Sequence, residues 1–368
     1  MNDIEQRVSS GQSWADFCDA LKRAGEQIQR PEAPADTFTR AEGYRYLSRL
    51  ARAGLEWYLE FNDADFPVLY KPSHETIKIG ADNPDNIYEK AVVSGRHDYR
   101  VRATRGSVHY ISMTTSKGSY AEDFKQTETG FVDSHELDVD ADGRFEIILS
   151  ATPKPGNWLP MDVDSQSLLI RQTFLDRATE VPAEFLIERL DTGAAPLPLT
   201  AEKLDTGLRT ASTFVENTAR MFANWSASWL DQPNQMPPAD QQLCQSVGGD
   251  PNIFYYHGFF DLADDEALVV EVARIPDCLS WNLQVDNYWM ESLDYRYLQI
   301  HVNKHTAQYA ADGSVRIVIA GRDPGVGNWL TTAGHRSGTL CFRWIGASEQ
   351  VHPTCRVVKI DSLVQAGK

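Results

Sequence analysis

The sequence contains no hydrophobic run approaching the roughly 20 residues needed to span a bilayer. Its first residues, MNDIEQRVSSGQSW, lack the basic region and the apolar stretch of a secretory signal. Basic residues are in the minority, with 35 Lys and Arg against 52 Asp and Glu, which gives a net charge of −17. Because nucleic acids and anionic membranes repel a negative surface, we expect a cytoplasmic protein with no nucleic-acid partner and no membrane insertion.

Cysteine pairs and cofactor motifs are also missing. The five cysteines are scattered, and none forms the close CxxC spacing of a zinc or redox site. The chain has no GxxxxGK[ST] loop, no GxGxxG after a strand, no HExxH helix and no GxSxG elbow. These absences argue against an ATPase, a dinucleotide dehydrogenase, a zincin or an α/β-hydrolase, and we expect no cofactor. His301 and His305 would be about 13 Å apart on a strand, too far to share one ion directly, so no metal site is predicted.

Two segments have the apolar spacing of helices. Residues 11–62 predict two helices, the first with Ser13 as its cap and with Trp14 and Phe17 on its apolar stripe. Residues 199–231 predict a long helix capped by Thr200. From about residue 75, and again from about residue 250, short alternating runs separated by polar turns predict strands.

The strongest signal is an internal repeat. Residues 142–159 read DGRFEIILSATPKPGNWL and residues 312–330 read DGSVRIVIAGRDPGVGNWL. Downstream, residues 169–171 match residues 341–343, which places Arg171 against Arg343; upstream, residues 86–88 match residues 252–254. The Asp-Gly pairs predict tight hairpin turns, and the Trp of each Gly-Asn-Trp-Leu predicts a buried anchor. A period this long indicates a duplicated domain.

The second copy resembles the bacterial family known as domain of unknown function 1214. The resemblance rests on SWNLQVDNYWM, the Asp294-Tyr295-Arg296-Tyr297 segment, ADGSVRIVIAG, GNWLTT and LCFRWIG, within residues 279–345. Thr331 departs from the proline usual in that family, whereas Pro160 of the first copy keeps it. The resemblance implies a β-sandwich or jelly-roll-like fold, a frequent companion called domain of unknown function 1254, and no established reaction.

Together these patterns predict a mainly β protein with helical additions (α+β), built from two duplicated antiparallel modules. We expect a helical region over 1–75, one module over 76–185, a helical connector over 186–245, a second module over 246–350 and a tail over 351–368. A homo-oligomer is compatible with the exposed helices.

Aromatic residues concentrate in the second copy, with polar residues interleaved among them. An apolar pocket with a few convergent polar groups is the usual form of a small-molecule site. The predicted ligand contacts are Tyr256, Trp281, Tyr288, Trp289, Arg296, Asn303 and Arg322. The alternative is that these aromatic rings fill the two faces of a sandwich.

Three residues are candidates for catalysis. His257 could be a general base, or a structural hydrogen-bonding group. Asp286 follows an apolar strand and could have a raised pKa suited to proton transfer, or could cap a turn. Tyr295, with Arg296, could bind an oxyanion, although Arg296 could instead pair with Asp294 or Glu291.

The residues therefore suggest a cofactor-independent enzyme that acts on a lipophilic or aromatic small molecule by acid–base chemistry. Isomerase, lyase and hydrolase activities all fit. The alternatives are a protein that binds small molecules or carbohydrates without catalysis, and a structural or assembly protein. Fold alone does not decide among them.

Overall fold

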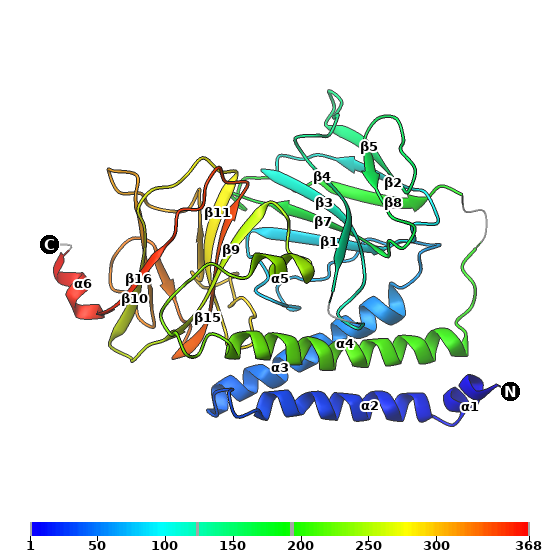
Figure 1. Cartoon of the computed structure of the whole chain (residues 1–368), viewed down its shortest axis with the longest axis horizontal. Helices are drawn as coiled ribbons and strands as arrows, with labels where there is room; N and C mark the ends of the chain where they lie inside the picture. Colours follow the sequence, from blue (N-terminus) through cyan, green and yellow to red (C-terminus); the bar gives the residue numbers. More distant parts are fainter. Residues whose placement is uncertain (1, 123–124, 192–194, 367–368) are drawn as a thin grey trace.

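The computed structural model describes residues 2–122, 125–191 and 195–366. Two β modules lie side by side above a layer of helices (Figure 1). The layer contains α1 (Asp3–Ser9), α2 (Gln12–Ala24), α3 (Thr37–Leu55) and α4 (Ala201–Ala227), with a 3₁₀ turn η1 (Gly25–Gln29) and a π turn η2 (Glu56–Glu60) after α2 and α3. Two short helices, α5 (Gln241–Ser246) and α6 (Ile360–Ala366), complete the helical part. In the described ranges, no helix is both long and apolar enough to cross a membrane.

Module one contains eight strands in two sheets. The strands are β1 (Asn86–Val92), β2 (Tyr99–Thr104), β3 (Tyr110–Lys117), β4 (Thr127–Asp133), β5 (Arg144–Ser150), β6 (Trp158–Pro160), β7 (Ser167–Thr173) and β8 (Glu184–Arg189). Their order is β1-β7-β3-β4 in one sheet and β6-β5-β2-β8 in the other. The chain thus crosses between the sheets from β1 to β2 and from β2 to β3, and apolar side chains of both sheets form a closed core.

Module two repeats this arrangement. Its strands are β9 (Ile253–Asp261), β10 (Glu266–Val272), β11 (Ser280–Asp286), β12 (His301–Asn303), β13 (Val315–Ala320), β14 (Trp329–Thr331), β15 (Ser337–Ile345) and β16 (Thr354–Lys359). The orders are β9-β15-β11-β12 and β16-β10-β13-β14, the same as in module one. The predicted fold class, mainly β with two duplicated modules and added helices, is confirmed.

Strand pairing gives the register of the duplication. Tyr88 of β1 pairs with Arg171 of β7, and Tyr255 of β9 pairs with Arg343 of β15. The match of Arg171 with Arg343 therefore makes Tyr88 equivalent to Tyr255. The sequence match of residues 86–88 with 252–254 was wrong by one residue, a slip that would turn every side chain to the other face of the sheet.

The Gly-Asn-Trp-Leu segments form the same latch twice. Asn157 and Asn328 each donate from Nδ2 to two backbone carbonyls and accept a backbone N–H. The rings of Trp158 and Trp329 are half-buried, and each indole donates to a strand carbonyl at 3.1 Å. The prediction of a buried Trp anchor was wrong. The hydrogen bonds of the asparagine side chain hold each segment in place, and the leucine after each tryptophan fills the core.

Three local expectations also change. β16 lies in the segment expected to be a tail, since an edge strand with exposed side chains shows no apolar alternation. The Asp-Gly turns precede β5 and β13 but do not form hairpins, because β4 and β12 belong to the other sheets. Ser13 is not a cap: α2 begins after Gly11, and the Ser13 hydroxyl donates to the buried Asp205 of α4 at 2.6 Å. The Thr200 cap is confirmed, since its side chain accepts from the Lys203 N–H.

Gly258 of β9 is packed too tightly for any side chain. A Cβ there would lie 2.2 Å from the carbonyl oxygen of Gln235. We expect Gly258→Ala to lower the free energy of unfolding by about 1–3 kcal/mol, the usual cost of overpacking, in urea denaturation. Gly25→Ala is the control, because a Cβ at Gly25 meets nothing within 4 Å. Equal stability of the two variants would contradict this packing.

Candidate functional site

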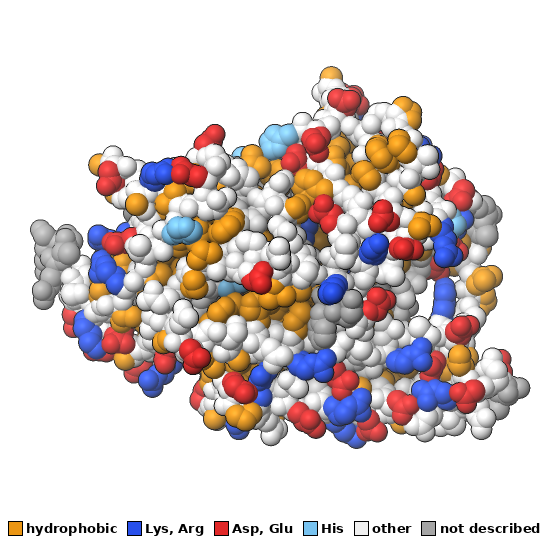
Figure 2. All heavy atoms as spheres, viewed as in Figure 1, with side chains coloured by type: hydrophobic (Ala, Val, Ile, Leu, Met, Phe, Trp, Pro, Cys, Tyr) orange, Lys and Arg blue, Asp and Glu red, His pale blue; other side chains and the backbone are white. Residues whose placement is uncertain are grey.

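A cavity of about 170 Å³ lies where the two modules and α4 meet. Equivalent strand positions of both modules line it: Tyr88, Lys90 and Arg171 from module one, and Tyr255, His257 and Arg343 from module two. Phe222 and Trp225 of α4 add apolar walls. We call it the inter-module cavity. In Figure 2, hydrophobic side chains gather near the centre of the visible face, over α5 and the end of α4.

Two buried arginines give the cavity its charge. Arg343 is 4% exposed; its Nη1 donates to Gln284 Oε1 at 2.5 Å and its Nη2 to the carbonyl of Ala81. Arg171 is 7% exposed, donates to the carbonyl of Gly248 and lies 3.9 Å from a carboxylate oxygen of Asp250. Within the described ranges, no carboxylate lies within 4 Å of the Arg343 guanidinium. A buried charge without a counter-ion is costly, so this cation is available to an anion.

Other polar groups of the cavity wall also have unused hydrogen-bonding capacity. The Tyr88 hydroxyl accepts the Asn83 N–H at 3.1 Å, and the Tyr255 hydroxyl accepts the Asp250 N–H at 3.2 Å. In the part of the chain that is described, neither hydroxyl proton has an acceptor. The buried Trp57 Nε1 and His257 Nδ1 also lack a partner there. A ligand with hydrogen-bonding groups would satisfy several of them at once.

Burial shifts two ionisable groups of the cavity toward their neutral forms. It lowers the pKa of His257 to about 3, and the field of Arg343 adds to the shift. It lowers the pKa of Lys90 to about 8, with Arg171 adding in the same direction. His257 is therefore neutral at pH 7, enclosed by the rings of Trp225, Trp229 and Tyr255. A neutral imidazole with so low a pKa is a weak general base.

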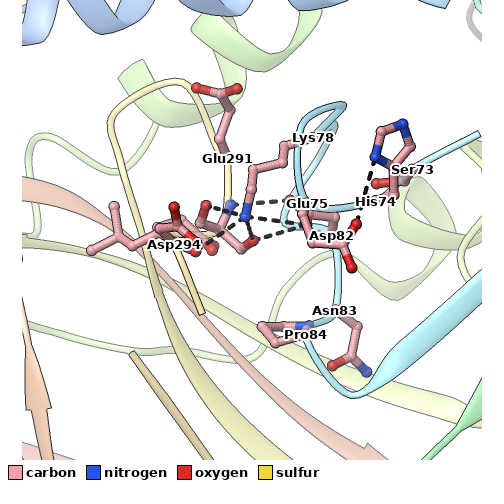
Figure 3. A network of polar contacts seen from close by, with 12 residues as sticks. Ser73, His74, Glu75, Lys78, Asp82, Asn83, Pro84, Glu291 and Asp294 are labelled. Atoms are coloured by element: carbon pink, nitrogen blue, oxygen red, sulfur yellow. Dashed lines mark hydrogen bonds and ion pairs between the residues drawn. The ribbon is translucent and has the colours of Figure 1, made fainter. Parts of the chain in front are cut away.

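The segment of residues 78–86, here called loop 78–86, forms one wall of the cavity and is held by buried ionic contacts. Lys78 Nζ donates to the Ser292 hydroxyl at 2.5 Å and to the carbonyls of Ser292 and Leu293 at 2.7 and 3.1 Å. Asp82 approaches from the other side, 3.9 Å from Lys78, and accepts from the Ser292 N–H and hydroxyl (Figure 3). The network joins the wall to the segment after β11.

The same loop adopts a strained backbone beside Arg343. Gly80 and Ala81 both have positive φ, +63° and +57°. A Cβ on Gly80 would lie 2.5 Å from the ring of Phe222, and Ala81 holds a conformation that costs a non-glycine residue energy. The Ala81 N–H donates to the Met290 carbonyl at 2.7 Å, while its carbonyl accepts from Arg343. The loop thus orients the guanidinium.

Asp286, a predicted catalytic residue, is fully buried at the end of β11 and does not line the cavity. Its Oδ1 accepts from Gln284 Nε2 at 2.6 Å, whereas its Oδ2 has no partner in the described ranges. Burial raises its pKa to about 7. The predicted raised pKa therefore has a physical basis. The carboxyl group lies behind the cavity wall, where Gln284 bonds both to it and to Arg343 and where it also interacts electrostatically with Arg343.

The predicted aromatic contacts lie inside the protein core. Tyr256 and Trp281 belong to the core of module two, where the Tyr256 hydroxyl contacts His352 Nδ1 at 2.9 Å. Tyr288 and Trp289 pack against the helical layer, and their polar atoms donate to the carbonyls of Glu32 and Thr39. These positions agree with the alternative interpretation, in which the aromatic rings fill faces inside the protein instead of contacting a ligand.

The remaining predicted polar residues are separated from one another. Tyr295 is half-buried beneath Lys78, whose Nζ lies 4.4 Å from the ring centre. Arg296 forms a salt bridge with Asp294 at 2.7 Å, and Arg322 pairs with Asp361 at 2.8 Å, both at the surface. Asn303 is buried and donates to Asp85 at 2.9 Å. Of the predicted site residues, His257 lines the cavity.

Histidines gather with carboxylates in pairs. His301 lies 3.1 Å from Asp85, and His305 lies 3.9 Å from Asp176. Over the described ranges, no three His, Cys, Asp or Glu side chains are placed to hold one metal ion.

The cavity residues that the sequence analysis missed come mainly from module one. The repeat matched Arg171 with Arg343, but neither arginine was among the predicted site residues. Tyr88 and Lys90 were hidden by the one-residue slip in the repeat. A match of buried basic residues at equivalent positions of two modules is the signal that could have indicated a shared site.

The geometry defines a class: a duplicated β-sandwich protein with a basic cavity between its copies. The chain belongs to the family described as "Protein of unknown function (DUF1214)", whose model matches residues 86–173 and 268–349, one stretch in each module. An uncharacterized protein from Burkholderia cenocepacia has a similar crystal structure, with 57% identity, a TM-score of 0.96, and coverage of 97% of this chain and 99% of that chain. The VPA0106 protein from Vibrio parahaemolyticus is 11% identical with a TM-score of 0.47, over 86% of this chain and 98% of that chain. No curated protein matches.

Proposed function

We propose that the protein binds a small organic acid with an apolar body in the inter-module cavity. The acid group would bind Arg343 and Arg171, and the apolar part would pack against Phe222 and Trp225. The observation that carries the proposal is the buried Arg343, which lines the cavity and whose guanidinium has no carboxylate within 4 Å in the described ranges. Bidentate pairing with a planar carboxylate is the interaction for which a guanidinium is best suited.

The volume of the cavity limits the ligand. An engineered apolar cavity of about 150 Å³ holds benzene. The inter-module cavity, about 170 Å³, therefore fits an acid of the size of benzoate or smaller.

The acid–base enzyme that the sequence suggests is supported less well than a binding function. His257 lines the cavity, but burial lowers its pKa to about 3. Asp286 does not line the cavity, and neither does Tyr295, whose ring lies beside Lys78. Because acid–base catalysis requires its groups within hydrogen-bond reach of one substrate, this set does not favour that mechanism.

The test compares benzoate with benzamide in thermal unfolding. A ligand that binds only the native state stabilises it by about 2.7 kcal/mol at a concentration 100 times its Kd. We expect benzoate to raise Tm and benzamide, which has nearly the same shape but no charge, to raise it much less. Arg343→Gln should abolish the benzoate shift. The control is Arg316→Gln, because Arg316 forms an exposed pair with Glu271.

Arg343→Gln removes buried hydrogen bonds and could unfold the protein, so a second pair of variants is needed. Tyr88→Phe and Tyr255→Phe remove one hydroxyl each and keep both rings. Each should weaken benzoate binding by about 1 kcal/mol, the usual value of a hydrogen bond, or roughly fivefold in Kd. Equal shifts with benzoate and benzamide, or full binding by every variant, would refute the proposal.

A further inference from the structure

Lys90 is a half-buried lysine that has no carboxylate partner among the described residues. It lies on β1 and lines both the inter-module cavity and a neighbouring cavity of about 310 Å³. Its Nζ lies 5.9 Å from the ring centre of Trp57, which lines both cavities too. Within the described part of the chain, no carboxylate lies within 4 Å of the Lys90 ammonium. The amine therefore faces space in which a ligand could sit.

The position of Lys90 relative to the arginines suits a ligand with two functional groups. Tyr88, which pairs with Arg171, is two residues from Lys90 on the same face of β1. Two residues of a strand span about 7 Å, so the amine and the Arg171 guanidinium reach the same space from adjacent positions. The field of Arg171 acts on Lys90, which agrees with this proximity.

The surroundings of Lys90 favour its neutral, nucleophilic form. Apolar burial and a neighbouring cation are the two conditions that activate lysines for attack on carbonyl carbons. Both act here, because burial is the larger cause of the lowered pKa and Arg171 is the second. At the resulting pKa of about 8, the neutral fraction at pH 7 is about two orders of magnitude larger than that of an ordinary lysine.

Trp57 supplies an independent indication of a ligand. Its side chain is 7% exposed, and its Nε1 has no hydrogen-bond partner in the described ranges. An indole N–H can only donate, so the missing partner is an acceptor such as a carbonyl or carboxylate oxygen. A ligand oxygen beside Lys90 would satisfy it.

We propose that Lys90 forms a Schiff base with a small oxo acid whose carboxylate is held by Arg171 and Arg343. The neutral amine attacks the carbonyl carbon, and a C–N bond forms. The carbonyl C–O bond then breaks, and its oxygen leaves as water with the two hydrogens of the amine, which gives a C=N bond. Nothing is oxidised or reduced, and no further reactant is needed.

This inference rests on the proposed function, since it assigns a second group to the same acid ligand. The experiment incubates the whole protein at pH 7 with 2-oxobutanoate, acetoacetate or 4-oxopentanoate and with sodium cyanoborohydride, which reduces an imine to a stable amine. Peptide mass spectrometry then locates the adduct, which adds the mass of the ligand less one oxygen atom. Butanone, which lacks the carboxylate, is the matched probe.

We expect the adduct on Lys90, more than on other lysines by about the two orders of magnitude that separate their neutral fractions. Lys90→Arg keeps the charge and cannot condense, so it should lose the adduct, and circular dichroism should show that the variant remains folded. Lys71→Arg, at an exposed position, should leave labelling unchanged. Benzoate should compete with labelling, and butanone should react much less than the oxo acids.

The outcomes separate the two claims. Benzoate binding that depends on Arg343, without an adduct on Lys90, would overturn the Schiff base and leave the proposed function standing. Adducts on Lys90 that form equally well with butanone would overturn the choice of an oxo acid and weaken the proposed function. Adducts spread over surface lysines, or retained in Lys90→Arg, would overturn the role of Lys90.

Discussion

Asp286→Asn is expected to stabilise the protein at pH 8 and to leave its stability nearly unchanged near pH 4. Burial raises the pKa of Asp286 to about 7; the Gln284 hydrogen bond lowers it and the charge of Asp82 raises it. In the unfolded chain the pKa of an aspartate is about 3.9. Between these values the folded protein holds a proton that the unfolded chain has released.

The sign of the effect follows from this difference in bound protons. The contribution of Asp286 to the free energy of unfolding of the wild type is highest below about pH 4. It falls as pH rises toward about 7 and is constant above that value. The total is about three pKa units, or about 4 kcal/mol at 1.36 kcal/mol per unit. Asparagine is neutral throughout, can keep the Oδ1 acceptor for Gln284, and avoids the cost of ionisation.

The measurement is urea denaturation of wild type and Asp286→Asn at pH 4, 6 and 8. The free energy of unfolding of the variant should increase relative to that of the wild type as pH rises, by a few kcal/mol at pH 8. Asp264→Asn, at an exposed position, should show no such pH-dependent difference. A constant difference between wild type and Asp286→Asn from pH 4 to pH 8 would mean that Asp286 titrates normally, in contradiction to its burial.

Lys78→Met is expected to lower the free energy of unfolding by about 3–5 kcal/mol, the usual cost of removing one partner of a buried ion pair. The substitution removes the donor to the Ser292 hydroxyl and to the carbonyls of Ser292 and Leu293. It also leaves Asp82, 6% exposed, without its cation. Urea denaturation at pH 7 gives the loss directly.

Two controls identify the cause of that loss. Lys22→Met breaks an exposed pair with Asp19, and should cost less than about 1 kcal/mol. The double variant Lys78→Met with Asp82→Asn removes both charges, so it should be more stable than Lys78→Met alone. A loss below 1 kcal/mol in Lys78→Met would show that the network does not hold loop 78–86.

The duplication could be predicted because its signals are local. The repeated Gly-Asn-Trp-Leu segments and the alternating strands before them appear in both copies, and the structure gives both modules the same strand order. The exact register could not be predicted from the apolar pattern, because Tyr88 and Lys90 lie on the side of β1 that faces the cavity. In an ordinary sheet such residues would face solvent, so a register shifted by one residue still gave a plausible alternation of apolar and polar residues.

The site was harder to predict because aromatic residues serve the core as well as ligands. Trp281 and Tyr256 fill module two, and Trp289 attaches it to the helical layer. The cavity instead forms between modules, from positions about 170 residues apart in sequence, such as Arg171 and Arg343. Their proximity depends on how the modules pack, which no local pattern specifies.

Net charge was also a poor guide to the ligand. The chain carries −17, which favours neutral or apolar ligands at its surface. Among the described residues that line the cavity, the cations Arg171, Arg343 and Lys90 outnumber the one carboxylate, Asp82, so the local charge has the opposite sign. Fields in a buried site are weakly screened by solvent, so the local groups decide which ligand is favoured.

Binding of an acid at the arginines is best tested by a crystal structure of the protein with benzoate. We expect the carboxylate to lie between the modules, within hydrogen-bond distance of the Arg343 guanidinium, and the ring to pack against Phe222 and Trp225. Benzoate found at the surface alone, or in the cavity with its carboxylate turned away from both arginines, would contradict it.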